Sequence, residues 1–429
     1  MAEPADRPPP IRIEDLAEPV FDPETTALMA AAAPLAGSIE LSAESLVRQA
    51  RADTGLHDLG DTGFVERLER LCRALEREAG LSPFGRVTVS VQLGQLVRNR
   101  LYLQDLLARH PEIHEVEVTR PIVIAGLPRT GTTHLHNLLA ADPALRSLPY
   151  WESLEPVLPP AEAAAVAAGG ADPRPARTEA ALELLHRALP HFRRMHEMTV
   201  DHIHEEIQLL AIDASSMLFE TTAPMPSWRD DYLDRDQTPH YAFLCTVLQA
   251  LQWLRPGDAP EVRWVLKSPQ HLEQLVPLSA VFPDATVVLT HRDPVSVTAS
   301  MCTMLAYTAR LHCAPVDPVA IGAYWSDRLA RMLDACVRDR DRLGSDRSID
   351  VHFDRFMADD LGTVARIYEL AGRPFEPARD ALVTYRDCHP RGRFGGLVYD
   401  LSEFGLDAGE LRRRFAGYTS RFGVTEEPW

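Results

Sequence analysis

The sequence lacks long hydrophobic segments. It contains no uninterrupted apolar stretch of about 18 residues, the length that a membrane-spanning helix requires. Its first ten residues are rich in proline and charge and contain no apolar core of a signal peptide. The six cysteines are scattered and form no C-x-x-C pair, so we expect reduced thiols rather than a disulfide or metal framework. These absences predict a cytoplasmic protein with no membrane span.

The chain also lacks an excess of basic residues. Its 429 residues include 62 acidic side chains against 44 lysines and arginines, for a formal net charge of −18. A nucleic-acid partner is therefore not expected, because such binding depends on a broad positive surface. Hydrophobic residues make up 45% of the chain, which is enough for a sizeable core. Cations inside short anion-binding patterns stand out against this acidic background.

The pattern of apolar residues predicts three regions. Residues 1–40 are rich in Pro, Ala and Glu and predict an extended or poorly ordered arm. Apolar residues at helical spacing predict a helical region over 41–115 and a helical insertion over about 155–255. A continuous apolar run at 122–125 predicts a central parallel strand, and apolar-rich segments predict further strands at 262–266, 285–290 and 349–353. Because these strands alternate with helices, we expect residues 116–429 to form an α/β domain with a parallel sheet flanked by helices.

One segment nearly matches a phosphate-binding loop. Residues 121–133 read Pro-Ile-Val-Ile-Ala-Gly-Leu-Pro-Arg-Thr-Gly-Thr-Thr, which predicts a buried strand, a glycine loop and the start of a helix. Gly126, Gly131 and Thr133 match the P-loop pattern, but Thr132 stands where that pattern has lysine. The loop carries its cation earlier, as Arg129. It therefore keeps the groups that bind a 5′-phosphate and lacks the lysine that reaches the β- and γ-phosphates of a nucleoside triphosphate.

A second candidate anion site follows the predicted strand at 285–290. An NTPase would carry a magnesium-binding aspartate after such a strand, but here the first charged residue is the cation Arg292. Ser300 lies two turns along the predicted helix, so Arg292 and Ser300 can hold a second phosphate together. The alternative is an ordinary surface pair between Arg292 and Asp293. Two anion sites, with no lysine for a γ-phosphate and no evident magnesium ligand, favour a nucleotide with two separate phosphates.

Four motifs, in this order along the chain, resemble those of sulfotransferases that use 3′-phosphoadenosine 5′-phosphosulfate (PAPS). They are a 5′-phosphosulfate loop at 127–133, a Leu-Lys-Ser-Pro-Gln-His-Leu segment at 266–272, a 3′-phosphate motif at 292–300, and a C-terminal block over 391–406 similar to that of a bacterial branch. The resemblance spans roughly residues 93–423. It implies a P-loop-NTPase-like α/β fold and PAPS as co-substrate, with 3′,5′-ADP as product and no required metal. The implied acceptor is a hydroxyl of a small hydrophobic or lipid-like molecule.

The resemblance also implies roles for individual residues. Arg129 and Lys267 would contact the transferring sulfuryl group, and Arg292 and Ser300 the 3′-phosphate. The residues expected around the 5′-phosphate are Pro128, Arg129, Thr130, Gly131, Thr132 and Thr133. Arg391, Gly392 and Arg393 would close over the nucleotide like the family's C-terminal Arg-Lys-Gly loop, although the order here is Arg-Gly-Arg.

The acceptor hydroxyl needs a base to take its proton. Some branches of the family use a histidine, and others a glutamate about 20 residues after the phosphosulfate loop. Glu152 lies at about that distance and is the preferred candidate. His271 and His134 are alternatives, although His271 is four residues after Lys267 and the cytosolic enzymes place their histidine two residues after the lysine.

Other interpretations of the sequence remain open. His202, His204 and Glu206 could suggest a metal site, but a third partner at a recognised spacing is missing, so none is predicted. A P-loop kinase or NTPase is an alternative function, against which Thr132 counts, and a non-catalytic nucleotide-binding protein is another. The sequence leaves open the acceptor's identity and the oligomeric state, for which a homodimer is one alternative.

Overall fold

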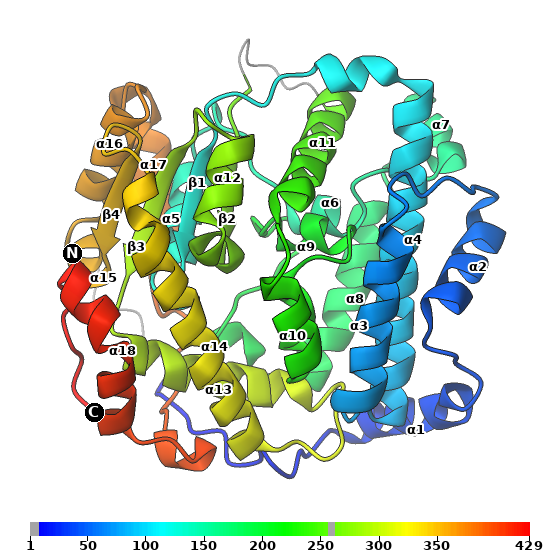
Figure 1. Cartoon of the computed structure of the whole chain (residues 1–429), viewed down its shortest axis with the longest axis horizontal. Coiled ribbons are helices and arrows are strands. Elements are labelled where there is room, and N and C mark those ends of the chain that lie inside the picture. The colour runs from blue at the N-terminus through cyan, green and yellow to red at the C-terminus, as the bar shows by residue number, and fades with distance from the viewer. Residues whose placement is uncertain (1–7, 256–261) are drawn as a thin grey trace.

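A four-stranded parallel sheet organises the computed structural model, which describes residues 8–255 and 262–429 (Figure 1). The strands are β1 (Ile122–Gly126), β2 (Val265–Ser268), β3 (Thr286–His291) and β4 (Ser348–His352), in the order β2-β1-β3-β4. The predicted α/β fold class is confirmed. Strand β2 begins later than predicted because its ladder starts at Val265, which pairs with Ile122 at the start of β1, and it ends later because Lys267 and Ser268 continue the ladder. Residues 256–261, just before the predicted start of that strand, lie outside the described residues.

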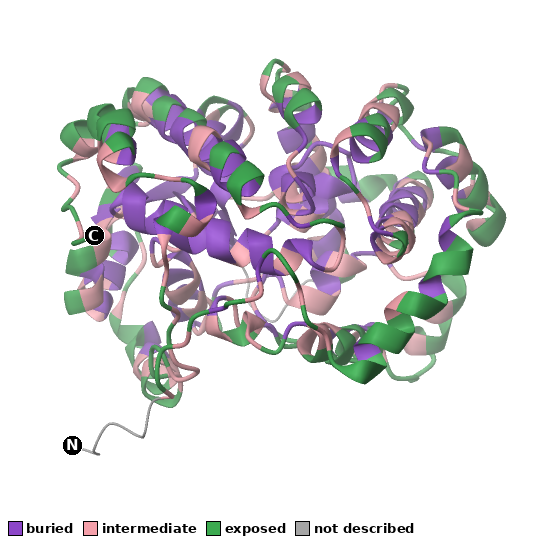
Figure 2. Cartoon of the chain, turned by 90° about the horizontal axis from the view of Figure 1, so that it is seen from below, coloured by how far each residue is buried: buried purple, intermediate pink, exposed green. Residues whose placement is uncertain are grey.

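Helices cover both faces of the sheet. Ile122 and Ile124 of β1 pack on one side, and Val123 and Ala125 on the other, as the two-residue period of a strand requires. The first face is covered by α5 (Thr132–Ala140), α15 (Phe353–Ala358), α16 (Asp360–Leu370) and α17 (Glu376–Cys388). The second is covered by α12 (Leu275–Val281), α13 (Pro294–Ala309), α14 (Pro318–Asp339) and α18 (Ala408–Phe422). The strands are therefore largely buried, as Figure 2 shows.

The N-terminal helices pack beside this α/β part, on the right of Figure 1. They are α1 (Pro23–Ala36), α2 (Ala43–Thr54), α3 (Phe64–Glu78) and α4 (Pro83–Arg109). Helix α1 differs from the arm predicted over 1–40: Asp22 accepts hydrogen bonds from the Glu24 and Thr25 N–H groups, Pro23 opens the helix, and alanines continue it. Residues 8–22 are mostly extended and held by Asp15, which pairs with Arg310. Residues 1–7 of the predicted arm lie outside the described residues.

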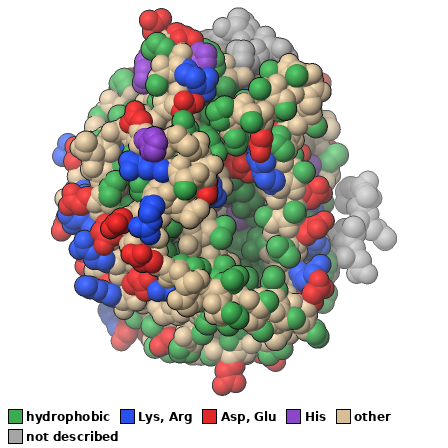
Figure 3. Space-filling view, turned by 90° about the vertical axis from the view of Figure 1, so that its right-hand side faces the viewer, with side chains coloured by type: hydrophobic (Ala, Val, Ile, Leu, Met, Phe, Trp, Pro, Cys, Tyr) green, Lys and Arg blue, Asp and Glu red, His purple; other side chains and the backbone are tan. Residues whose placement is uncertain are grey.

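Further helices fill the segment between β1 and β2. They are α6 (Tyr150–Leu154), α7 (Pro160–Ala167), α8 (Arg174–Ala188), α9 (Ile207–Ala211), α10 (Pro226–Leu233) and α11 (Thr238–Leu254). Short 3-10 helices complete the chain: η1 (Pro111–Glu115), η2 (Phe192–Arg194), η3 (Met217–Thr221), η4 (Pro269–Glu273), η5 (Arg340–Arg342) and η6 (Leu401–Phe404). No helix in the described part of the chain has the length and apolar character to cross a bilayer. On the face in Figure 3, acidic and basic side chains are interspersed and hydrophobic side chains gather around a hollow.

Candidate active site

The loop after β1 turns sharply into helix α5. Gly131 is the N-cap of α5 and has a φ of +86°, a left-handed conformation that favours glycine. Arg129 is also left-handed, with a φ of +69°, which is a strained conformation for a residue with a side chain. At Gly126 a Cβ atom would overlap the Thr290 hydroxyl, so the close approach of β1 and β3 there requires glycine. Because the N-cap is a glycine, no N-cap side chain occupies the first N–H groups of α5, and an anion can accept from them.

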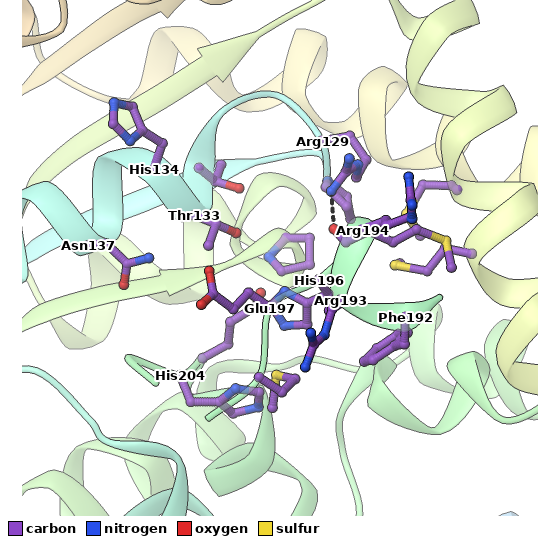
Figure 4. A pocket seen from close by; sticks show the side chains of 18 of the residues that line it. Arg129, Thr133, His134, Asn137, Phe192, Arg193, Arg194, His196, Glu197 and His204 are labelled. Atoms are coloured by element: carbon purple, nitrogen blue, oxygen red, sulfur yellow. Dashed lines mark hydrogen bonds between the residues drawn. The ribbon is translucent and has the colours of Figure 1, made fainter. Parts of the chain in front are cut away.

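A pocket of about 710 Å³ opens where the strands end (Figure 4). In an open parallel sheet this carboxyl edge is where ligands bind. Eleven residues predicted for the site line the pocket: Pro128, Arg129, Gly131, Thr132, Thr133, His134, Lys267, Arg292, Arg391, Gly392 and Arg393. Its apolar lining includes Met301, Met304 and Leu305 of α13. The structure thus brings cations from four separate segments to one cavity with a partly apolar wall.

The two predicted phosphate sites are directly connected. The Nε of Arg129 donates to the Ser300 hydroxyl at 3.1 Å, and the Nη1 of Arg292 donates to the Arg129 carbonyl oxygen at 2.8 Å. Thr130 is buried beneath the loop, with its hydroxyl 2.6 Å from that of Thr290 and donating to the Leu127 carbonyl. Arg129 and Arg292 therefore lie close enough for one nucleotide to contact both.

Arg292 has a partner that the sequence did not reveal. Its Nε and Nη2 donate to the two carboxylate oxygens of Glu427, at 2.6 and 2.9 Å. Its guanidinium carbon also lies 4.1 Å from the centre of the Phe353 ring. Burial raises the pKa of Glu427, but the hydrogen bonds and charge of Arg292 outweigh burial and lower that pKa overall. A carboxylate from the C-terminal segment thus holds the arginine expected to bind a phosphate.

Lys267 is the only lysine in the chain. Its side chain is 3% exposed, and its ammonium group contacts the carboxylate of Glu205, which also lines the pocket. The backbone N–H of Lys267 donates to the carboxylate of Glu206 at 2.9 Å. No role for Glu205 was predicted from the sequence. The sequence signals for this contact were the adjacent pair of glutamates and the single lysine, but only the fold brings them together.

The structure does not bring Glu152 to this pocket. Glu152 lies in the first turn of α6, its side chain is 2% exposed, and it is not among the pocket-lining residues. Arg255 donates to its carboxylate at 2.9 Å, and Arg146 lies 3.6 Å from the same oxygen. Glu152 was selected by its spacing along the chain, which does not determine where its side chain points. In the structure the side chain points to Arg255 and Arg146, whose charges stabilise its carboxylate.

The two histidine alternatives differ in position. His271 is fully buried and does not line the pocket: its Nδ1 lies 2.7 Å from the Tyr241 hydroxyl, and its Nε2 contacts the Glu206 carboxylate. His134 lines the pocket, with its Nε2 3.0 Å from a carboxylate oxygen of Asp360. Burial lowers the pKa of His134 and outweighs the opposing effect of Asp360.

The C-terminal loop predicted to close over the nucleotide reaches the pocket. Arg391 donates to the Met357 carbonyl oxygen at 3.1 Å, and Arg393 pairs with Glu197. Gly392 between them has a φ of +71°. Both arginines therefore lie at the rim beside the loop that begins α5.

Three histidines lie at another part of the pocket, where His196 and His204 line the wall and His202 lies beside them. Burial lowers the pKa values of His196, His202 and His204, and the charge of Lys267 lowers them further. The pKa of His202 falls to about 4. His202 and His204 stand out in the sequence, but His196 does not, because it precedes them by several residues and joins them only in the fold.

Comparisons with known proteins found a matching family and similar folds. A model of the sulfotransferase family matches residues 121–377. The fold is similar to the crystal structure of sulfotransferase STF1 from Mycobacterium tuberculosis H37Rv, with 32% identity, a TM-score of 0.74, and coverage of 87% of this chain and 98% of that one. It is also similar to sulfotransferase STF9 from Mycobacterium avium, with 27% identity, a TM-score of 0.80, and coverage of 91% and 99%. No curated protein sequence matches the chain.

Proposed function

Since this chain belongs to the sulfotransferase family, we propose that it transfers a sulfuryl group from PAPS to a hydroxyl of a small hydrophobic or lipid-like acceptor. The observation that carries the choice of donor is the connection between the two anion sites. Arg129 and Arg292 lie in one pocket and share a hydrogen bond, and Ser300 accepts from Arg129. PAPS carries its 5′-phosphosulfate and its 3′-phosphate on one nucleoside and needs such a pair of sites.

Transfer proceeds by in-line displacement at sulfur. The acceptor oxygen forms a bond to sulfur as the bond from sulfur to the 5′-phosphate oxygen breaks, and 3′,5′-ADP leaves. The leaving phosphate gains negative charge, which Arg129, Lys267 and the free N–H groups of Thr132 and Thr133 stabilise. Arg292 and Ser300 hold the 3′-phosphate, and Arg391, Gly392 and Arg393 cover the nucleotide. Because these groups are in place before reaction, positioning supplies much of the rate.

We assign the base to Glu205. Its carboxylate lies in the pocket against the Lys267 ammonium group, where the sulfuryl group is expected. When Lys267 turns to the bridging oxygen of PAPS, the carboxylate is freed to accept the acceptor's proton. His134 is the alternative within the pocket, and Glu152 remains the choice favoured by sequence spacing.

The acceptor's character follows from the remaining wall of the pocket. The residues Leu185, Leu189, Phe192, Met217, Leu218, Met301, Met304 and Leu305 contribute apolar surface. Burying an apolar acceptor against such a wall lowers the free energy of binding, whereas a sugar would gain less from it. We place the reaction in the cytoplasm, because all six cysteines are free thiols.

The donor is tested by comparing nucleotides in a calorimetric titration. We expect 3′,5′-ADP to bind more tightly than ADP, because ADP leaves Arg292 without a phosphate. Because Lys267 is the only lysine, an amine-reactive reagent can label one side chain, and 3′,5′-ADP should protect that peptide in mass spectrometry. Equal affinity for the two nucleotides would overturn the proposal, as would failure of PAPS to sulfate any member of a broad panel of hydroxylated acceptors.

The base is tested with three matched variants: Glu205→Gln, His134→Gln and Glu152→Gln. Glu205→Gln should retain 3′,5′-ADP binding and slow single turnover by about 10²–10⁴-fold, the range for loss of a general base. The other two should turn over at a rate near that of the parent. A slow Glu152→Gln variant beside a fast Glu205→Gln variant would return the base to Glu152.

A further inference from the structure

Three histidine side chains meet beside the pocket, and two of them, His196 and His204, line it. His196 lies just after η2, and His202 and His204 lie in the segment before α9. Each offers a ring nitrogen within 4.8 Å of those of the other two. The ring centres of His196 and His202 are 5.1 Å apart, and those of His202 and His204 are 5.9 Å apart. Figure 4 shows His196 and His204 among the side chains lining the cavity.

These imidazoles are buried or half-buried and have no polar partner. Among the described residues, no side-chain hydrogen bond or ion pair reaches His196, His202 or His204, and the Nδ1 of His204 is fully buried without a partner. Two other buried histidines have carboxylate partners: His240 pairs with Asp213 at 2.5 Å, and His291 with Asp350 at 2.8 Å. The buried and unpartnered Nδ1 of His204 costs free energy, and the ring nitrogens of His196 and His202 lie close enough to share a ligand with His204.

We propose that His196, His202 and His204 form a site for a divalent transition-metal ion of the zinc type. Neutral imidazole is a preferred ligand of this class, and three protein ligands leave a fourth position open. A Zn–N distance of about 2.0–2.1 Å in a tetrahedral site places the nitrogens about 3.3 Å apart. The three side chains therefore need to close by at most about 1.5 Å, a change that side-chain rotation supplies.

The charges around the cluster permit a cation. Lys267 and Arg129 are the nearby positive groups. The carboxylate of Glu205 contacts the Lys267 ammonium group, and the carboxylate of Glu206 accepts the Lys267 backbone N–H. Arg129 donates to Ser300 and to the Met195 carbonyl oxygen. Glu205 therefore offsets the charge of Lys267 beside the cluster.

The open position of the metal faces the pocket, because His196 and His204 both line it. An oxygen atom of the acceptor is the ligand expected there, an assignment that rests on the proposed sulfotransferase function. Metal binding by the three histidines does not rest on it.

The site is tested on the full chain with any affinity tag removed and metal stripped by a chelator. Co²⁺ is titrated alone and followed by its visible absorption, and Zn²⁺ is then added. We expect one Co²⁺ per chain, displaced by Zn²⁺, and a spectral change when azide is added as a small ligand for the open position. Absence of a stoichiometric Co²⁺ spectrum would overturn the site, and a spectrum insensitive to azide would overturn the open position.

Variants separate this site from adventitious binding. His202→Ala and His204→Ala should weaken Co²⁺ binding by at least about 100-fold, since loss of an outer partner alone costs about 10–100-fold. His57→Ala changes an exposed histidine that is distant in sequence from the cluster, and it should bind Co²⁺ like the parent. If an alanine variant fails to melt cooperatively, His202→Asn and His204→Asn replace it. Parent-like Co²⁺ binding by folded His202 and His204 variants would overturn the proposal.

The parent protein and the histidine variants also distinguish the metal-site proposal from the proposed sulfuryl donor. Each is also titrated with 3′,5′-ADP, which reports the nucleotide site through Arg129 and Arg292. Stoichiometric Co²⁺ binding without 3′,5′-ADP binding would support the metal site and overturn the proposed donor. The reverse result would overturn the metal site and leave the donor supported.

Discussion

Arg129 and Arg292 are 163 residues apart in the chain, yet the Nη1 of Arg292 donates to the backbone oxygen of Arg129. Arg129 is itself held in a left-handed conformation, and the Arg292 guanidinium lies over the Phe353 ring. Such contacts fix two guanidinium groups before a ligand arrives. Preorganised cations bind phosphate more strongly because little side-chain freedom remains to be lost.

Removing either guanidinium should weaken nucleotide binding. A hydrogen bond to a charged group contributes about 1.5–3 kcal/mol, so Arg129→Ala and Arg292→Ala should each raise the Kd for 3′,5′-ADP by about 10–100-fold. Calorimetric titration measures the change. Arg379→Ala, at an exposed arginine on α17, should retain the parent Kd. An unchanged Kd in Arg292→Ala would contradict its role at the 3′-phosphate.

Glu427 occupies the guanidinium that the 3′-phosphate needs, so its removal should tighten binding. Both side chains are partly exposed, and pairs of this kind contribute about 0–1 kcal/mol. Glu427→Gln should therefore lower the Kd for 3′,5′-ADP by up to about fivefold. The matched control is Glu426→Gln, which removes the neighbouring carboxylate that pairs with Arg412. Weaker nucleotide binding in Glu427→Gln would show that Glu427 supports the site rather than competes for it.

At the scale of elements, the turn from β1 into α5 is the decisive unit. It combines a close approach at Gly126, a left-handed Arg129 and a left-handed glycine N-cap at Gly131. Together they place the first N–H groups of α5 at the pocket. The dipole of α5 adds a favourable interaction with an anion at that end. The backbone of the turn is therefore suited to bind an anion even without the contribution of side chains.

Gly131→Ala tests this turn against a matched glycine. Gly131 and Gly169 both have left-handed φ values, +86° and +94°, so alanine at either should cost about 1–2 kcal/mol of stability. A Cβ at Gly131 would also lie 3.3 Å from Phe353 and Phe356, whereas nothing lies within 4 Å at Gly169. Denaturant unfolding should show losses in both variants, and calorimetry should show weaker 3′,5′-ADP binding only in Gly131→Ala. Equal nucleotide affinity in the two variants would argue against the turn.

At the scale of the whole molecule, buried ion pairs connect the regions of the chain. Arg328 of α14 is fully buried and donates to Glu220 of η3 at 2.9 Å and to Glu273 of η4 at 2.5 Å. Glu220 lies in the insertion and Glu273 follows β2, so this arginine links the insertion to the sheet. Residues of both regions line the pocket.

Arg328→Met should be strongly destabilising, because it leaves two buried carboxylates without their cation. Removing one partner from a buried network costs about 3–5 kcal/mol. Arg331→Met on the same helix removes only partly exposed pairs and should cost at most about 1 kcal/mol. Chemical denaturation measures both. Similar losses in the two variants would contradict the structural role of Arg328.

The sequence by itself determined the structural features that depend on residues close together in the chain. The strand, loop and helix around Gly126 and Gly131 could be predicted because backbone geometry there depends on local residue type. The α/β class followed from apolar runs alternating with helical patterns. Helix α1 was missed because its alanine-rich segment resembles the composition of a mobile arm, while the Asp22 cap and packing stabilise it as a helix.

Only the tertiary structure decided which side chains share the pocket. Glu152 matched the expected spacing but turns to Arg255 and Arg146, while Glu205 contacts Lys267 from a segment 62 residues away. Likewise, Glu427 reaches Arg292, and His196 completes a group with His202 and His204. A buried charged or polar group takes the partner that packing places beside it, and packing between distant segments is not encoded in local spacing. The phosphate loop was therefore predictable from the sequence, whereas the partners of its cations were not.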